Sequence, residues 1–143
     1  MTFHSKKADH HGYRSSFEEK IAKQLDECGV EYEYEPIGEK ISYTIPIRVH
    51  KYLPDFVLSN GIIIETKGHF TSSDRQKHLA IKAQHPELDI RFVFANPNKK
   101  LSKISKTTYA QWCKKYGFKF ASKCVPLEWI EEKTEISLNK RKD

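Results

Sequence analysis

The stretch "YLPDFVLSNGIIIETKG", residues 52–68, places three ionisable side chains in two otherwise apolar strands. Asp55 stands at the start of the first strand, and Glu65 and Lys67 stand near the end of the second. Two carboxylates held close together on a hairpin form a hard-oxygen site that suits Mg²⁺. Such a cation can hold a phosphate group and lower the pKa of a bound water, so these residues indicate phosphodiester hydrolysis.

Whether the two acids meet depends on the turn at 59–61. A two-residue Asn-Gly turn would pair positions that sum to 121 and place Asp55 and Glu65 on opposite faces. A three-residue loop with Gly61 in the left-handed conformation would pair positions that sum to 120 and place the acids opposite each other. The burial of apolar residues does not distinguish the two turns, because both strands are apolar on both faces. Lys67 shares the face of Glu65 and offsets the repulsion between the acids, which favours the three-residue loop.

Two further groups could complete the site. The backbone carbonyl of Thr66 is an additional oxygen ligand for a metal ion. The Lys67 ammonium could orient the attacking water or neutralise charge that develops on the phosphate. The simplest alternative is an ordinary cross-strand pair of acids, braced by the lysine, with no metal.

A second metal ion would need one more carboxylate, and Glu18 is the candidate. It lies in the first turn of an expected helix, bordering the apolar stripe that includes Ile21 and Ala22. Ser15 and Ser16 are both candidate N-caps, and each has a glutamate three residues later (Glu18 and Glu19), which is the capping-box spacing. Completing that capping box is therefore the alternative role of Glu18.

Hydrophobic periodicity and turn residues predict the elements that must position these groups. Their order is helix, four strands, helix, strand, helix, which favours an α/β fold with a mixed β-sheet flanked by helices. Pro46 marks the long extended segment as an edge strand or a broken one. The expected elements are a helix at 15–28, strands at 30–37 and 40–53, the hairpin at 52–68, a helix at 71–86, a strand at 89–96, a helix at 107–116, a short strand at 118–121 and a final turn at 126–130.

The helix at 71–86 has its own start signal. Ser73 and Gln76 fit a capping box. Leu79 is expected to pack, while Lys77 and His78 are expected to face solvent.

Length and composition indicate one globular domain. We expect a basic N-terminal arm at 1–13, one domain at 14–130 that carries these acids, and a charged tail at 131–143. No apolar run approaches the roughly 18 residues of a membrane span. The N-terminus has no apolar segment of the kind that marks a protein for secretion, so we expect a cytoplasmic location. The cysteines are three in number and lack C-x-x-C spacing, which favours free thiols over a zinc site.

Positive charge is concentrated in one window. The net charge is +6, yet residues 99–123 hold eight lysines and no acid. Such a cluster is a plausible phosphate-binding surface, although charge runs are often only solvated helix faces. The residues that we expect to contact DNA are Arg14, His69, Arg75, Lys77, Lys99, Lys100, Lys103 and Lys106, together with Lys67.

Pro-Asp, then a hairpin, then Glu-x-Lys resembles the PD-(D/E)xK signature of many restriction enzymes and junction resolvases. The stretches "YRSSFEEKIAKQL", "YLPDFVLSNGIIIETKG", "DRQKHLAIKAQHPELDIRFVF" and "PLEWI" are similar to the phage Holliday-junction resolvases of that superfamily. The resemblance covers roughly residues 13 to 130 and does not extend clearly into the arm or the tail.

The resemblance implies a restriction-endonuclease-like fold and a metal-dependent endonuclease that cuts four-way and other branched DNA. It implies Mg²⁺ or Mn²⁺, two ions per active site, acting in an infected bacterial cell. Asp55 and Glu65 match the catalytic acids of the family and Lys67 matches its lysine. Glu18 matches a further catalytic glutamate, which argues against a role in capping alone.

The resemblance also implies an intertwined homodimer. A β-segment is exchanged between subunits, so that Glu18 of one chain would complete the Asp55 site of the other. The extended run at 40–53 has no obvious place in a monomer, which agrees with exchange. Two alternatives stay open: a sequence-specific restriction-type nuclease, for which 143 residues leave little room, and a non-catalytic module that binds branched DNA.

Overall fold

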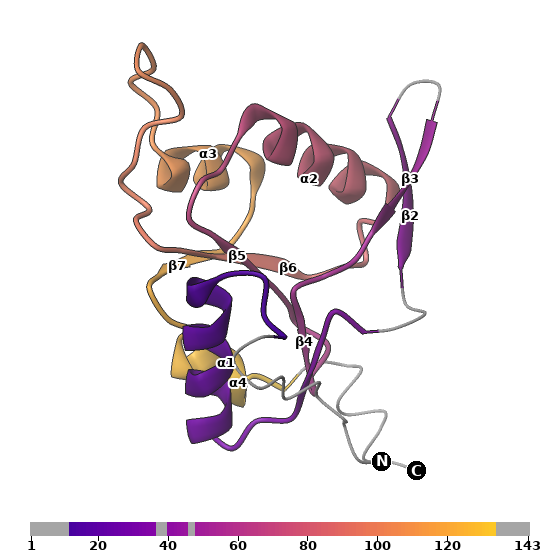
Figure 1. Ribbon diagram of the computed structural model, residues 1–143. Helices are drawn as coiled ribbons and strands as arrows, with labels where there is room; N and C mark the ends of the chain where they lie inside the picture. The colour runs from indigo at the N-terminus through magenta and orange to yellow at the C-terminus, as the bar shows by residue number, and fades with distance from the viewer. Residues whose placement is uncertain (1–11, 37–39, 46–47, 134–143) are drawn as a thin grey trace.

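The computed structural model describes residues 12–36, 40–45 and 48–133. Most of the expected N-terminal arm and tail, as well as Pro46, lies outside these residues. Within them, five strands form one mixed sheet with helices on both faces, and a two-stranded hairpin stands beside it (Figure 1). The order of elements therefore predicted the fold class correctly.

The sheet has the strand order β1-β4-β5-β6-β7. β4 is antiparallel to both β1 and β5, whereas β5, β6 and β7 run parallel. The central strands β5 and β6 are almost wholly buried because helices cover both of their faces. This burial explains why their sequences do not alternate. The strands are β1 (Tyr32–Tyr34), β4 (Phe56–Leu58), β5 (Ile63–Lys67), β6 (Ile90–Phe94) and β7 (Phe120–Ser122).

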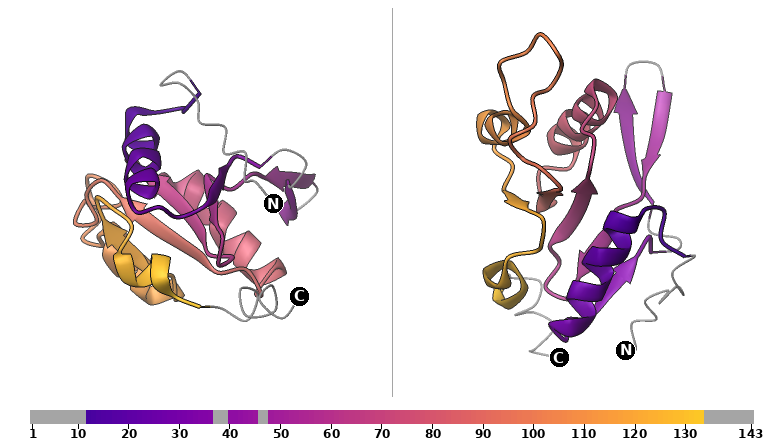
Figure 2. Two further views of the ribbon diagram at one scale, coloured as in Figure 1. Left: turned by 90° about the horizontal axis from the view of Figure 1, so that it is seen from below. Right: turned by 60° about the vertical axis from the view of Figure 1, so that its left-hand side comes forward.

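Each face of the sheet has its own pair of helices. α1 (Ser16–Glu27) and α4 (Leu127–Glu131) lie on one face, and α2 (Ser72–Gln84) and α3 (Tyr109–Tyr116) lie on the other (Figures 1 and 2). Two separate clusters of buried side chains correspond to the two faces. None of the described helices is both long and apolar enough to cross a membrane.

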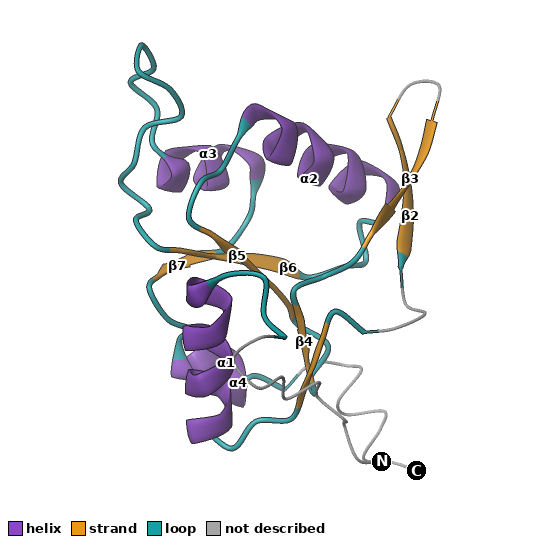
Figure 3. Cartoon of the chain, in the orientation of Figure 1, coloured by secondary structure: helices purple, strands orange, loops and turns teal. Residues whose placement is uncertain are grey.

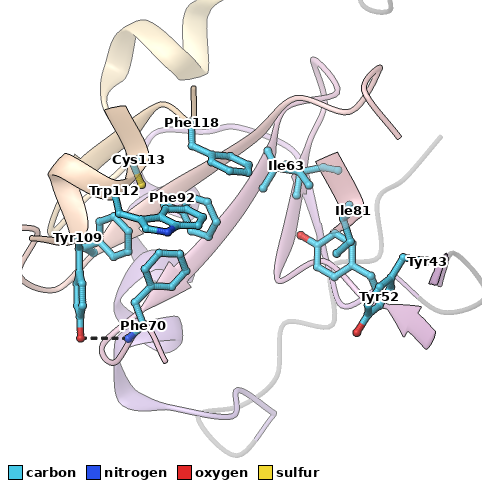
Figure 4. Close-up of a cluster of buried hydrophobic side chains, with 12 residues drawn as sticks. Tyr43, Tyr52, Ile63, Phe70, Ile81, Phe92, Tyr109, Trp112, Cys113 and Phe118 are labelled. Carbon is cyan, nitrogen blue, oxygen red and sulfur yellow. Dashed lines mark hydrogen bonds between the residues drawn. The ribbon is translucent and has the colours of Figure 1, made fainter. Parts of the chain in front are cut away.

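The cluster below α2 and α3 is rich in aromatic rings. The ring centroid of Phe70 lies 5.0 Å from that of Phe92 and 4.9 Å from that of Trp112 (Figure 4). The backbone N–H of Phe70 donates to the Tyr109 hydroxyl over 3.2 Å. Because Phe70 lies three residues after Lys67, this packing fixes the backbone that leaves the end of β5.

The helix starts are set by side-chain caps. The Ser15 hydroxyl accepts the backbone N–H of Glu18 at the start of α1, so Ser15 is the cap and Ser16 is not. Thr71 and Asp74 form the capping box of α2, so the assignment to Ser73 and Gln76 was wrong. Thr71 is the N-cap because it directly precedes the first helical residue. Ser73 cannot cap the helix, because it already lies within it.

The segment at 40–53 is broken into two strands, which is one of the two outcomes that Pro46 led us to expect. It folds into an antiparallel hairpin of β2 (Ile41–Ile45) and β3 (Arg48–Tyr52), which stands beside α2 (Figure 2, right). The Gln84 side chain of α2 bonds both backbone groups of Thr44, over 2.6 Å and 2.5 Å. The idea that this run lacks a place in a single chain is therefore wrong.

Candidate active site

The hairpin register is the one that the site requires. Phe56 pairs with Ile64 and Val57 with Ile63, so the paired positions sum to 120. Gly61 has a φ of +90° and its backbone N–H donates to Leu58 over 2.9 Å. The prediction of a three-residue loop with a left-handed glycine is confirmed.

Asp55 and Glu65 meet at one edge of the sheet, where β1 ends, β4 begins and β5 ends. The Asp55 backbone N–H donates to Oε2 of Glu65 over 2.8 Å. Oδ2 of Asp55 accepts the Thr66 backbone N–H over 2.9 Å and the Thr66 hydroxyl over 3.1 Å. The backbone pairing of β4 with β5 stops at Phe56, the residue after Asp55, so side chains bridge the two strands here.

Glu18 comes to this edge from α1. Its side chain is buried, and the Tyr34 hydroxyl donates to its Oε2. The Glu18 carboxylate is therefore turned toward the sheet, while its backbone N–H alone serves the cap of α1. The structure brings Glu18 and Asp55 of the same chain within 4.8 Å of each other, measured between carboxylate oxygens.

Glu35 is a fourth acid at the site, and the sequence analysis missed it. One carboxylate oxygen from each of Glu18, Glu35 and Asp55 lies within 4.8 Å of the other two. Glu35 has a φ of +41°, a conformation that non-glycine residues seldom adopt, and its N–H donates to the Asp55 carbonyl over 3.2 Å. Apolar and charged residues alternate in the segment 30–37, which predicts that Glu35 is another charge that faces solvent. The positive φ at Glu35 leaves no clear sequence signal.

His78 was also misjudged. It was expected to face solvent, but its side chain is fully buried against the rings of Tyr52 and Phe92. Its Nε2 lies 3.5 Å from Oε1 of Glu65. A signal for this existed, because His78 lies three residues before the buried Ile81 and so shares its helix face.

The pKa values of Asp55 and Glu65 are shifted in opposite directions. Burial, reinforced by the charges of Glu65 and Glu18, raises the pKa of Asp55 well above its usual value. Burial acts in the same direction on Glu65, but His78, Lys67 and the Asp55 N–H outweigh it and hold the pKa of Glu65 below its usual value. Without a cation, the charge of Asp55 is therefore less well balanced than that of Glu65.

Lys67 lies where the pattern predicted, two residues beyond Glu65 on β5. Its charge acts on both Asp55 and Glu65. Its Nζ lies 3.4 Å from Oδ1 of Asp74, in the first turn of α2. Asp74 thus helps to hold the ammonium at the edge of the site.

The expected DNA-contact residues divide into two groups. His69, Lys99, Lys100 and Lys103 line one open groove with a volume of about 530 Å³, and Lys106 lies exposed on the same loop. Nζ of Lys99 lies 3.0 Å from Nδ1 of His69.

The other three expected residues already have partners in the chain. Nη1 of Arg14 lies 3.5 Å from Glu35. The Arg75 guanidinium donates to the Phe70 carbonyl over 2.6 Å, and Nζ of Lys77 lies 5.1 Å from the centre of the Tyr52 ring.

A model of the family described as phage endonuclease I matches residues 1–142. The chain belongs to the phage endonuclease I family. It is 50% identical to endonuclease I of Escherichia phage T7 over 131 residues, which covers 91% of this chain and 87% of that protein. It is 49% identical to endodeoxyribonuclease 1 of Enterobacteria phage T3, covering 91% of this chain and 85% of the relative.

The match to the phage endonuclease I family extends beyond the resemblance read from the sequence. That resemblance covered residues 13 to 130, whereas the family match includes both chain ends. The matched residues include the acidic edge (Glu18, Glu35, Asp55 and Glu65), Lys67, and the basic groove lined by His69, Lys99, Lys100 and Lys103.

Proposed function

We propose that this chain is a metal-dependent endodeoxyribonuclease that hydrolyses phosphodiester bonds in four-way junctions and other branched DNA. The observation that carries the proposal is the group of acids at the strand ends: carboxylate oxygens of Glu18, Glu35 and Asp55 lie within 4.8 Å of one another, and Glu65 accepts the Asp55 backbone N–H. Membership in the phage endonuclease I family supports the cleavage of phosphodiester bonds as the reaction at these acids. The cytoplasm of an infected bacterium is the corresponding place of action.

The donor set fits a hard divalent cation. Carboxylate oxygens are the ligands that Mg²⁺ and Mn²⁺ prefer, and the raised pKa of Asp55 marks a negative charge that lacks balance. Asp55 and Glu65, with the Thr66 carbonyl, would hold one ion. Glu18 and Glu35 would share Asp55 in holding a second. When bound, the ions would supply Lewis acidity toward the phosphate and the attacking water.

The chain supplies the remaining functions. The Lys67 ammonium can neutralise charge that develops on the phosphate, because it lies on the same strand face as Glu65. Asp74 holds it in position. The groove of His69, Lys99, Lys100 and Lys103 can bind a DNA backbone that crosses the site.

The proposed enzyme is a homodimer with exchanged segments. Glu18 precedes the β2–β3 hairpin in the chain, and Asp55 follows it. If the hairpin connection opened, α1 and β1 could dock on a second subunit through the same contacts that they make within one chain. Each site would then contain Glu18 and Glu35 of one subunit and Asp55 of the other, and two such sites would explain paired cuts across a junction.

The first experiment uses a four-way junction with Mg²⁺ and compares the native chain with Glu65→Ala. We expect the variant to bind the junction but not to cut it. Undiminished cutting would refute the site assignment. Loss of cutting with retained binding would exclude the purely architectural alternative, and equal cutting of junctions with unrelated arm sequences would exclude the restriction-type alternative.

The second experiment tests exchange. Glu18→Ala and Glu65→Ala chains are unfolded together and refolded as a mixture. Heterodimers with shared sites would contain one intact site, so nicking of a junction should return. If the mixture stays as inactive as either variant alone, each chain builds its own site.

A further inference from the structure

The loop between β6 and α3 projects well beyond the body of the fold (Figure 3). It starts beside the proposed site, because the last residues of β5 and β6 pair and the N–H of Ala95 donates to the Lys67 carbonyl over 3.0 Å. Ile104 lies in the middle of this loop with 96% of its surface exposed. Among the described residues, the other large exposed apolar side chains are Val49 at 68% and Leu127 at 56%.

The loop is held in shape by its own hydrogen bonds. Across its base, the Leu101 N–H donates to the Thr107 carbonyl over 2.9 Å. Nearer the middle, the Ser105 N–H donates to the Ser102 hydroxyl over 3.2 Å, and the Thr107 N–H donates to the Ser105 hydroxyl over 3.1 Å. The loop therefore presents Ile104 to solvent through a fixed backbone.

A single exposed apolar side chain normally needs no explanation. The surroundings of Ile104 are what set it apart. Lys103 and Lys106 flank it, both exposed, and no acid occurs from Lys99 to Lys123. Lys103 also lines the basic groove, so the apolar side chain belongs to a surface whose charge fits a polyanion.

We propose that Ile104 is an apolar wedge that this loop inserts into DNA, at the interrupted base stack of a branch point. Isoleucine is one of the side chains that proteins insert between base steps, where it partly unstacks them. Unstacking requires least energy where the stack is already broken. The lysines of the groove would hold the adjoining phosphates and so set how deeply the wedge enters.

This inference rests on the proposed function and goes beyond it, because it names a residue that touches bases. The test uses four-way junctions that carry 2-aminopurine either next to the branch or in the middle of an arm. Binding is measured without divalent cations, so that no DNA is cut. The variants are Ile104→Ser, Ile104→Leu and the control Leu127→Ser, which removes an exposed apolar side chain on α4.

We expect the native chain and Ile104→Leu to increase the fluorescence of the probe beside the branch and to leave the arm probe unchanged. Ile104→Ser should lose this increase and bind roughly tenfold more weakly, as the loss of one buried aliphatic side chain implies. Leu127→Ser should match the native chain in both respects.

The wedge is refuted if Ile104→Ser binds and perturbs the junction as the native chain does. It is also refuted if the substitution lowers binding to vesicles of anionic lipid, or self-association without DNA, while binding to the junction is unchanged. Cutting of the same junctions by the native chain with Mg²⁺ tests the proposed function separately. If the native chain cuts and Ile104→Ser behaves normally, only the wedge fails.

Discussion

The charge of Asp55 is less well balanced than that of Glu65, and that has a consequence for stability. The pKa of Asp55 is raised in the folded chain by burial and by Glu65 and Glu18, above an unfolded value of about 3.9. The folded chain thus binds this proton more readily than the unfolded chain. The destabilisation is absent below about pH 4, grows as the pH rises and is complete above the raised pKa.

Asp55→Asn should therefore raise the melting temperature of the metal-free protein at pH 7, by about 3 °C or more. The gain should shrink as the pH falls toward 4. Mg²⁺ should stabilise the native chain but not the variant, because the variant lacks the charge that a cation would balance. Thermal unfolding with EDTA and with Mg²⁺ measures both effects, and an unchanged or lower melting temperature at pH 7 would contradict them.

Glu35 gives a second test at the residue scale. Glu35→Gln should reduce junction cutting roughly 10- to 100-fold with little effect on binding, if this acid helps to hold a metal ion. Glu33→Gln is the matched control, because Glu33 lies two residues earlier on β1 and pairs with Val57, outside the acid group. Equal activity of the two variants would remove Glu35 from the site.

At the scale of elements, the start of α2 matters because Asp74 both caps this helix and faces Lys67. Thr71→Ala removes one half of the capping box and should lower the free energy of unfolding by about 1 kcal/mol. Ser73→Ala should change it by less than about 0.5 kcal/mol, since Ser73 is exposed and is not the cap. Denaturant unfolding of the two variants decides which residue is the cap.

The hairpin register and the ends of two helices were predictable from the sequence. The hairpin register followed from the charges of Asp55, Glu65 and Lys67, and Gly29 and Gly117 mark the ends of α1 and α3 with positive φ. These features are local, so short-range patterns carry them.

What could not be predicted depends on contacts between distant segments. The hairpin of β2 and β3 is fixed by its packing on α2. The burial of His78 was signalled only by the helix face that it shares with Ile81, because Tyr52 and Phe92, which enclose its ring, come from other segments. Glu35 reaches the site just beyond β1, where its backbone has a positive φ and its N–H donates to the Asp55 carbonyl.

For the whole molecule, the uneven charge leads to a prediction about salt. If groove lysines bind phosphates, the double change Lys99→Gln and Lys103→Gln should weaken binding to DNA of any sequence. It should also reduce the slope of log affinity against log salt by about 1.8. The double change Lys114→Gln and Lys115→Gln alters the net charge equally but lies on α3, outside the groove, and should reduce the slope much less.

The turn at 59–61 also makes the enzyme vulnerable in a way that no active-site residue reveals. A strand shifted by one position presents its side chains to the opposite face. An in-frame deletion of a single codon in this turn would favour the two-residue connection, which turns Asp55 away from Glu65. The gene would still encode every acid and lysine of the site, yet the protein would lose its catalytic activity. In genetic screens, inactive alleles with intact active-site codons should therefore cluster at this tip.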